Sequence, residues 1–233
     1  MSTFFVYIIE SPSAPDLYHK RSESEPLYEA LKLSQIPCIA RCTISRIAFE
    51  AAFNIGLKEE LQHFEGKWPI IHISCHANSD GIMLSNGEFI TWAELRDILL
   101  PINQILKGML VLCMSCCEGY SGVRMAMTLD DGDHPYFCLI GTPEKPTWSD
   151  TCVAFTTFYH RMSKGSHIND AVVAMRSASD HNSFFVEWAE SSKSAYLEYH
   201  KSFDTSTATQ ELSALANSMP ISSQNEQELL EKG

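Results

Sequence analysis

Apolar runs that alternate with stretches of helical spacing constrain the fold of this chain more than any other feature. Runs that are largely apolar, and rich in β-branched and aromatic residues, predict strands buried on both faces. They lie at Phe4–Ile9, Cys38–Ile44, Pro69–Cys75, Met109–Met114 and Tyr136–Ile140. Strands that alternate with helices are typical of a parallel sheet. We therefore expect an α/β fold, with a mostly parallel central sheet and helices on both of its faces.

Local signals between these runs predict the connecting elements. Asn86-Gly87 is a strong hairpin signal, and Thr91 with Glu94 has the spacing of a helix capping box. A loop rich in Ser and Pro is expected at residues 11–24. Helices are expected at residues 25–33, 45–64, 92–100, 122–129, 149–162 and 168–178, with a last helical stretch at 184–200. A parallel sheet places its active site beyond the carboxyl ends of the strands, so residues that follow the runs are the candidates for function.

Composition limits the class of protein and its domain organisation. Hydrophobic residues make up 45% and charged residues 20% of the 233 residues, as in an ordinary globular protein. After Phe203 the chain is polar, acidic and free of aromatic residues. We expect a folded domain at residues 1–202 and a flexible acidic tail at residues 203–233.

The charge and the hydropathy of the chain argue against two kinds of partner. The formal net charge of −12 opposes direct binding to nucleic acid and to anionic membranes. The chain has no run of about 18 apolar residues, which a membrane span requires. The N-terminus has the pattern of a strand and lacks that of a signal peptide. A reducing cytoplasmic location is expected, in which the eight cysteines remain free thiols.

Metal sites and cofactors are not expected from the spacing of ligand-type residues. Cys113, Cys116 and Cys117 resemble half of a zinc site, but no second pair follows at a suitable distance. Three carboxylates at residues 130–133, those of Asp130, Asp131 and Asp133, are too few for a typical calcium-binding loop. A thiol redox role for Cys113 and Cys116 is disfavoured, because such pairs normally open a helix and Cys113 lies within a predicted strand.

Cys117 and His76 each follow a predicted strand and together suggest nucleophilic catalysis. A thiol attacks a carbonyl only as a thiolate, and an imidazole can take its proton and later protonate the leaving amine. Side chains at the ends of neighbouring parallel strands lie close enough for this transfer. The backbone N–H of Cys117, with that of Ala77 after the histidine, is expected to form an oxyanion hole.

Short motifs around these two residues resemble those of the CHAT family of caspase-like cysteine proteases. His72-Ile73-Ser74-Cys75-His76-Ala77 is similar to the family's His-x-x-x-His-Gly motif. Ser115-Cys116-Cys117-Glu118 is similar to its Ser-Ala-Cys-Glu motif. The hairpin and helix at residues 81–95, and the helix pair at residues 158–172, resemble the family in the same order. The resemblance covers about residues 4–179.

The resemblance implies a caspase-like three-layer sandwich with about six strands and a Cys117–His76 dyad. It implies a cysteine endopeptidase that cleaves a protein substrate under the control of an activating protein or sensor, in prokaryotic defence or regulated cell death. Two departures are notable: Ala77 replaces the family's glycine, and Cys116 replaces its alanine. The alternative is an inactive CHAT-like module that binds a partner, and Cys116 is the alternative nucleophile.

Substrate preference is weakly encoded in the sequence. Relatives that cleave after basic residues carry an acidic residue shortly before the nucleophile, where this chain has Ser115 and Cys116. Ser115, together with Trp148 and Asp150 on the loop after the strand at residues 136–140, is expected to line a substrate pocket.

Overall fold

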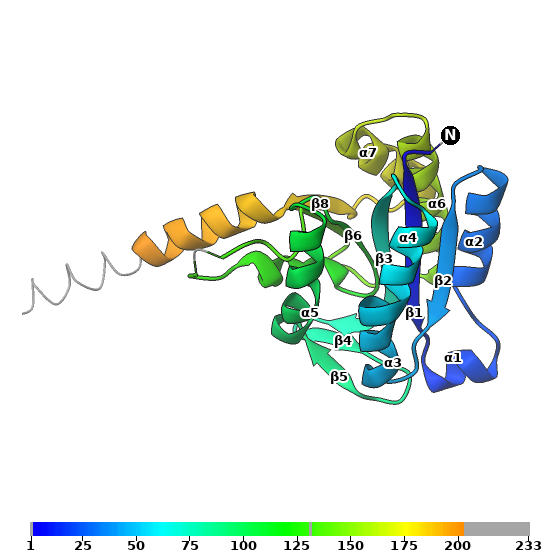
Figure 1. Cartoon of the computed structure of the whole chain (residues 1–233), viewed down its shortest axis with the longest axis horizontal. Coiled ribbons are helices and arrows are strands. Elements are labelled where there is room, and N and C mark those ends of the chain that lie inside the picture. The colour runs from blue at the N-terminus through cyan, green and yellow to red at the C-terminus, as the bar shows by residue number, and fades with distance from the viewer. Residues whose placement is uncertain (1, 131, 203–233) are drawn as a thin grey trace, which may run out of the picture. The chain divides into compact units, whose positions relative to one another are not determined.

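A six-stranded sheet forms the centre of the protein, whose computed structural model describes residues 2–130 and 132–202 (Figure 1). The strand order is β2-β1-β3-β6-β7-β8. All neighbours are parallel except β7 and β8. The bounds are β1 (Phe4–Ser11), β2 (Cys38–Cys42), β3 (Trp68–Asn78), β6 (Val111–Ser115), β7 (Cys138–Gly141) and β8 (Phe185–Trp188). The prediction of a mostly parallel central sheet is therefore confirmed.

Helices cover both faces of this sheet, as expected for a three-layer α/β sandwich (Figure 1). One layer contains α2 (Ser24–Leu33), α6 (Trp148–Ser163) and α7 (Ile168–Ser179). The other contains α3 (Arg46–Ala51), the π-helical turn η1 (Ala52–Leu57), α4 (Lys58–His63), α5 (Trp92–Ile105) and the 3₁₀ helix η2 (Gly119–Ala126). The short helix α1 (Ala14–Tyr18) lies between β1 and α2 in the sequence.

The strands are buried on both faces because alternate side chains point to opposite helical layers. In β1, Phe5, Tyr7 and Ile9 belong to one apolar cluster, and Phe4 and Val6 belong to the other. Burial of each such side chain contributes about 1.5–3 kcal/mol. Both faces of β1 pack against helices, so nearly every residue of the strand must be apolar. This explains the near-continuous apolar run in the sequence.

A β-hairpin extends the sheet beyond the parallel strands. Its strands are β4 (Gly81–Met83) and β5 (Phe89–Thr91), and β4 pairs with the last part of β3. Gly87 in its turn has φ of 87°, a conformation that glycine adopts without strain. Thr91 and Glu94 then form the capping box of α5. Both local predictions for this region are confirmed.

Several predicted elements differ from those observed. The predicted helical stretch at 184–200 begins with the edge strand β8, and only residues 189–202 are helical. A helix, α1, occupies part of the expected loop. The helix predicted at 122–129 is the 3₁₀ helix Gly119–Ala126. The helix predicted to end at Leu100 continues through Pro101 to Ile105.

Contacts distant in the sequence account for these differences. The strand β8 completes the hydrogen bonding of β7, which only the folded sheet can specify. The last turn of α5 is held beyond its proline by Asn103, whose side chain donates to the carbonyl of His134 and accepts from the N–H of Leu110. Tertiary contacts of this kind override local propensity.

The described chain forms a compact unit up to Ser194, and residues 195–202 belong to a second unit. The tail predicted at residues 203–233 lies outside the described residues, so that domain boundary stays a prediction. Within the part of the chain that the structure describes, no helix has the length and apolar character required to cross a membrane.

Candidate active site

A pocket opens at the carboxyl ends of β1, β3 and β6, where a parallel sheet is expected to bind ligands. The empty space within it, including its open mouth, is about 430 Å³. Its wall consists of Glu10, Ser11, Pro12, Glu23, Ser74, Cys75, His76, Ser115, Cys116, Cys117, Pro146, Trp148 and Thr151. The predicted residues Cys117, His76, Ser115 and Trp148 are therefore brought together, although they come from distant parts of the chain.

His76 lies in the part of β3 that extends past the parallel strands. The run was predicted to end at Cys75, but β3 continues to Asn78 because His76 pairs with Met83 of the hairpin. The side chain of His76 is 46% exposed, and its Nε2 atom lies 3.3 Å from Oδ2 of Asp16. Among the described residues, no hydrogen bond is made to the other ring nitrogen, Nδ1.

Asp16 of α1 is a residue of this site that the sequence did not reveal. Its carboxylate accepts a hydrogen bond from the hydroxyl of Ser13, and Arg21 lies 2.8 Å from its other oxygen. Burial acts to raise the pKa of Asp16, but the bonds to Ser13 and His76 and the charge of Arg21 outweigh it and lower this pKa. A charged carboxylate therefore faces the His76 ring.

Cys117 follows β6 and is half-buried beside a backbone held in an unusual conformation. Burial raises the pKa of its thiol, Lys145 opposes this change, and Glu118 adds to it. Glu118 has φ of 54° and its N–H donates to the carbonyl of Glu144. Within the described residues, the backbone N–H of Cys117 has no backbone acceptor and its thiol makes no hydrogen bond with His76.

The neighbouring thiol of Cys116 is buried in the core, as expected from the alternation of side chains along the strand. A hydrogen bond with Cys75 and burial both raise the pKa of Cys116 well above its ordinary value. Because a thiol reacts as the thiolate, this environment disfavours Cys116 as the nucleophile relative to Cys117.

Two predicted site residues do not line the pocket. Asp150 forms the capping box of α6 with Thr147, so its carboxylate satisfies the N-terminus of that helix. Ala77 is paired with Ile82 in the hairpin and packs against the core. Its role in an oxyanion hole stays a prediction. The expectation that Asp150 lines a substrate pocket also stays a prediction, and Asp150 is not among the residues that line the pocket described here.

A buried carboxylate, that of Glu23, lies at the inner wall of the pocket. It accepts hydrogen bonds from the hydroxyls of Ser74 (2.6 Å) and Ser115 (2.7 and 2.8 Å). The Nε2 atom of His72 is 3.9 Å away, and the Nδ1 atom of His72 is 2.9 Å from the Tyr159 hydroxyl. Sequence reasoning missed Glu23, because it lies in a Ser-rich segment with no motif and acquires its role only through the fold.

The carboxylates at residues 130–133, which were judged too few for a calcium-binding loop, include two that have other partners in the fold. Asp130 lies 2.9 Å from Arg96, and Asp133 accepts a hydrogen bond from Gln104. Asp131 lies outside the described residues. Among residues 2–130 and 132–202, no group of three or more His, Cys, Asp or Glu side chains is arranged to hold a metal ion.

Comparisons with known proteins found one kind of similarity. No family model matches the sequence, and no curated protein matches it. Among solved structures, the fold is similar to the crystal structure of the Arg-specific cysteine proteinase gingipain R, with a TM-score of 0.48 and 10% sequence identity. The aligned region covers 78% of this chain and 43% of that one, so the chain spans less than half of that structure.

Proposed function

We infer that the protein is a cysteine peptidase in which Cys117 is the nucleophile and His76 is the general base. The observation that carries this proposal is that both residues, from separate segments, line one pocket at the carboxyl ends of the strands. The motif resemblance to CHAT proteases assigns the same two residues to catalysis. The α/β sandwich supports the proposal but does not distinguish it from other functions, because folds host many activities.

Asp16 gives His76 the tautomer that this chemistry needs. If the Nε2–H of His76 donates to the Asp16 carboxylate, the proton occupies Nε2 and the lone pair occupies Nδ1. The Nδ1 atom is then the proton acceptor for the Cys117 thiol. The dyad expected from the sequence therefore gains a positioning carboxylate, which also stabilises the imidazolium formed when His76 takes the proton.

The reaction proceeds through two acyl-transfer steps. His76 takes the proton of Cys117, and the sulfur attacks the carbonyl carbon of the scissile peptide bond. The C–N bond breaks as His76 protonates the leaving amine, which leaves a thioester on Cys117. His76 then takes a proton from water, the resulting hydroxide attacks the thioester, and the C–S bond breaks as the thiol regains its proton. The N–H of Cys117, which has no backbone acceptor among the described residues, is suited to stabilise the oxyanion in both steps.

The resting pocket supports control by a partner. The raised pKa of Cys117 and its lack of a hydrogen bond with His76 describe a thiol that is not yet activated. A protein activator or the substrate itself would bring the two groups together. This regulation, and a role in defence or cell death, follow from the resemblance to CHAT proteases.

The same raised thiol pKa favours a second candidate function. A CHAT-like module that binds a protein partner through this pocket, without cleaving it, needs no activated thiol. The two functions differ in whether His76 increases the reactivity of Cys117.

Labelling with iodoacetamide distinguishes them. The rate of modification of Cys117 would be followed by peptide mapping in the unmodified chain, in His76→Ala and in Cys116→Ala, with and without candidate partner proteins. A peptidase predicts labelling of Cys117 that is slowed by His76→Ala but not by Cys116→Ala. Labelling that is indifferent to His76 under all conditions would overturn the peptidase proposal and favour the binding module.

A further inference from the structure

Buried carboxylates contribute negative charge to the wall of the pocket. Two carboxylates, those of Glu10 and Glu23, line the pocket, and no Lys or Arg is among its lining residues. Both side chains are buried, with 4% and 3% exposure. A buried charge is costly unless it is paired or fully hydrogen-bonded, so the partners of each carboxylate decide what the pocket accepts.

The Glu10 carboxylate is already satisfied within the fold. It accepts hydrogen bonds from the N–H groups of Glu23 and Ser24 and from the hydroxyls of Ser22 and Ser24. A carboxylate offers about four acceptor positions, and these four donors occupy them. Glu10 therefore fixes the turn that leads into α2, and it is this turn that places Glu23 at the pocket.

The Glu23 carboxylate retains acceptor capacity. Its donors are the hydroxyls of Ser74 and Ser115, which are neutral. The nearest basic atom, Nε2 of His72, is 3.9 Å away and has no hydrogen-bond partner. Burial opposes ionisation of Glu23, but the His72 ring and the two serine hydroxyls lower its pKa, so the carboxyl is charged at neutral pH.

We propose that Glu23 selects substrates with a lysine or arginine side chain next to the attacked carbonyl. The inference rests on the proposed peptidase function and names the substrate class of the same site. Ser115 bonds to Glu23 and is separated from Cys117 by one residue. Glu23, Ser115 and Cys117 line the same pocket, so a side chain that extends into it from a carbonyl held at Cys117 can reach Glu23.

Two other residues that line the pocket suit the stem of such a side chain. Trp148, which is 36% exposed, lines the pocket together with Pro146. An aromatic face and a proline ring can cover the methylene groups of Lys or Arg, and a guanidinium or ammonium also interacts favourably with an indole ring. The charged end would then reach Glu23, where a charge-assisted hydrogen bond is strongest because water is excluded.

The test uses peptidyl chloromethyl ketones that differ only in the residue next to the ketone. Probes with Arg, Lys, Leu and Asp would be reacted with the full chain, and modification of Cys117 would be followed by mass spectrometry. The Arg and Lys probes should react about 10- to 100-fold faster than the Leu probe, the factor that one hydrogen bond to a charged group is worth. The Asp probe should be the slowest.

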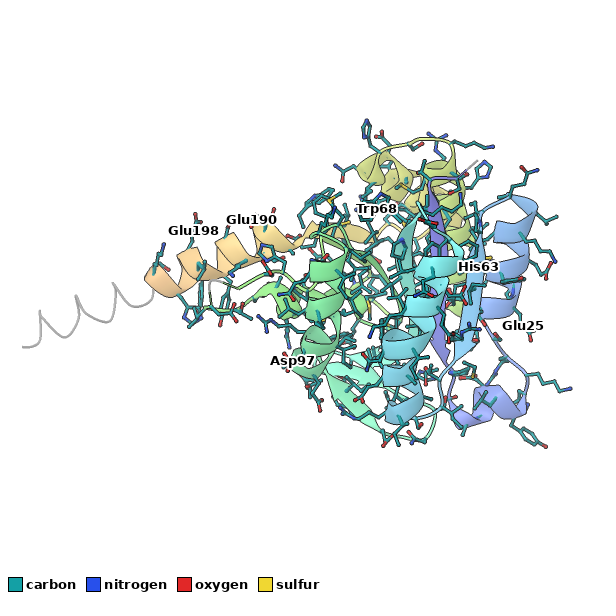
Figure 2. The ribbon with its side chains drawn as sticks, viewed as in Figure 1. Glu25, His63, Trp68, Asp97, Glu190 and Glu198 are labelled. Atoms are coloured by element: carbon teal, nitrogen blue, oxygen red, sulfur yellow. The ribbon has the colours of Figure 1, made fainter. Side chains whose placement is uncertain are left out.

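Glu23→Gln should abolish the preference, since the amide keeps the size of the side chain and removes its charge. The matched control is Glu25→Gln, which makes the same change two residues away. Glu25 is exposed on α2 (Figure 2). It is not among the residues that line the pocket. The control should keep the full preference. Equal preference in Glu23→Gln and in the unmodified chain would overturn the proposal and leave Glu23 as a structural partner of Ser74 and Ser115.

A second measurement depends neither on catalysis nor on a stable Glu23 variant. Agmatine, which carries a guanidinium on a short alkyl chain, should raise the melting temperature of the unmodified chain and of Glu25→Gln, while a neutral alcohol of similar length should not. No effect of agmatine would contradict the proposal. The effect of His76→Ala on the labelling of Cys117 is measured separately. Labelling that depends on His76 but shows no preference for Arg or Lys probes would contradict the selectivity alone, whereas labelling indifferent to His76 would contradict the peptidase function.

Discussion

The Nε2 atom of His76 lies 3.3 Å from the Oδ2 atom of Asp16. This contact joins strand β3 to α1, a helix of only five residues. The carboxylate is fixed by its own partners, Ser13 and Arg21. A histidine that is half-exposed would otherwise rotate freely. The contact therefore restricts the ring in the absence of substrate, and it provides the first prediction.

Asp16→Asn should slow His76-dependent reactions of Cys117 by at least about 10- to 100-fold, the cost of losing a carboxylate that orients a metal-bound histidine, because the carboxylate also stabilises the imidazolium. The asparagine keeps the shape of the side chain but no longer favours a proton on Nε2. The measurement is the pH dependence of Cys117 alkylation or of peptide cleavage. Arg21→Gln, which leaves the carboxylate in place, is the control and should have the smaller effect; equal rates in Asp16→Asn and the unmodified chain would rule out the positioning role.

Lys145 and Glu118 should shift the pKa of the Cys117 thiol in opposite directions. Lys145 lowers and Glu118 raises the pKa of Cys117, beneath the larger effect of burial. Lys145→Met should therefore move the pH midpoint of alkylation upward, and Glu118→Gln should move it downward. Each shift should be less than about one pH unit, because Lys145 is exposed and solvent screens its charge. Shifts of the same sign in both variants would contradict this account.

Alkaline pH should destabilise the fold through buried thiols. Cys138 is fully buried, and desolvation raises its pKa to about 12, whereas an unfolded cysteine titrates near 8.5. The raised value means that the stabilising contribution of this group is complete below about pH 8.5 and is lost as the pH rises toward 12. The free energy of unfolding should fall by about 1.4 kcal/mol per pH unit from this group.

Cys138→Ala tests this contribution. The variant is expected to be less stable at neutral pH because of the smaller side chain, but its stability should decline less steeply between about pH 9 and pH 12. Urea unfolding at several pH values measures both quantities. Parallel pH profiles for the two proteins would show that Cys138 does not contribute.

Gly119, which follows the Ser115–Glu118 motif, should not accept a larger residue without loss of stability. A Cβ atom at Gly119 would lie 2.8 Å from Sγ of Cys116 and 3.0 Å from the carbonyl oxygen of Met114. Gly119→Ala should therefore lower the free energy of unfolding by about 1–3 kcal/mol and slow the labelling of Cys117. The control is Gly132→Ala, where the added atom meets only the Asp130 side chain, at 3.4 Å or more. Similar stability of both variants would refute the steric argument.

Much of the layered architecture was predictable, because its signals are local and repeated. The run that forms β1 is apolar on both faces, and Thr91 with Glu94 forms a capping box whose spacing is visible in any sequence. Cys117 and His76 were placed near strand ends by the same reasoning, and the structure locates both in one pocket. Their catalytic pairing remains a prediction.

The carboxylates that contact His76 and Ser115 were not predictable, for a physical reason. Asp16 and Glu23 lie in a polar segment in which carboxylates are usually solvated. Each acquires its role from partners far away in the sequence: His76 for Asp16, and Ser115 for Glu23. Conversely, Asp150 looked like a pocket residue but serves its own helix through Thr147, a local role that its spacing already allowed.

The segment between β1 and α2 has a consequence for engineering. It carries both Asp16, beside the histidine, and Glu23, at the inner wall, while Cys117 and His76 come from other parts of the chain. The proposed positioning carboxylate and the proposed selectivity carboxylate thus share one short stretch of sequence. A designed connection that keeps Asp16 and changes residue 23 would alter the proposed preference without rebuilding the sheet that carries the nucleophile.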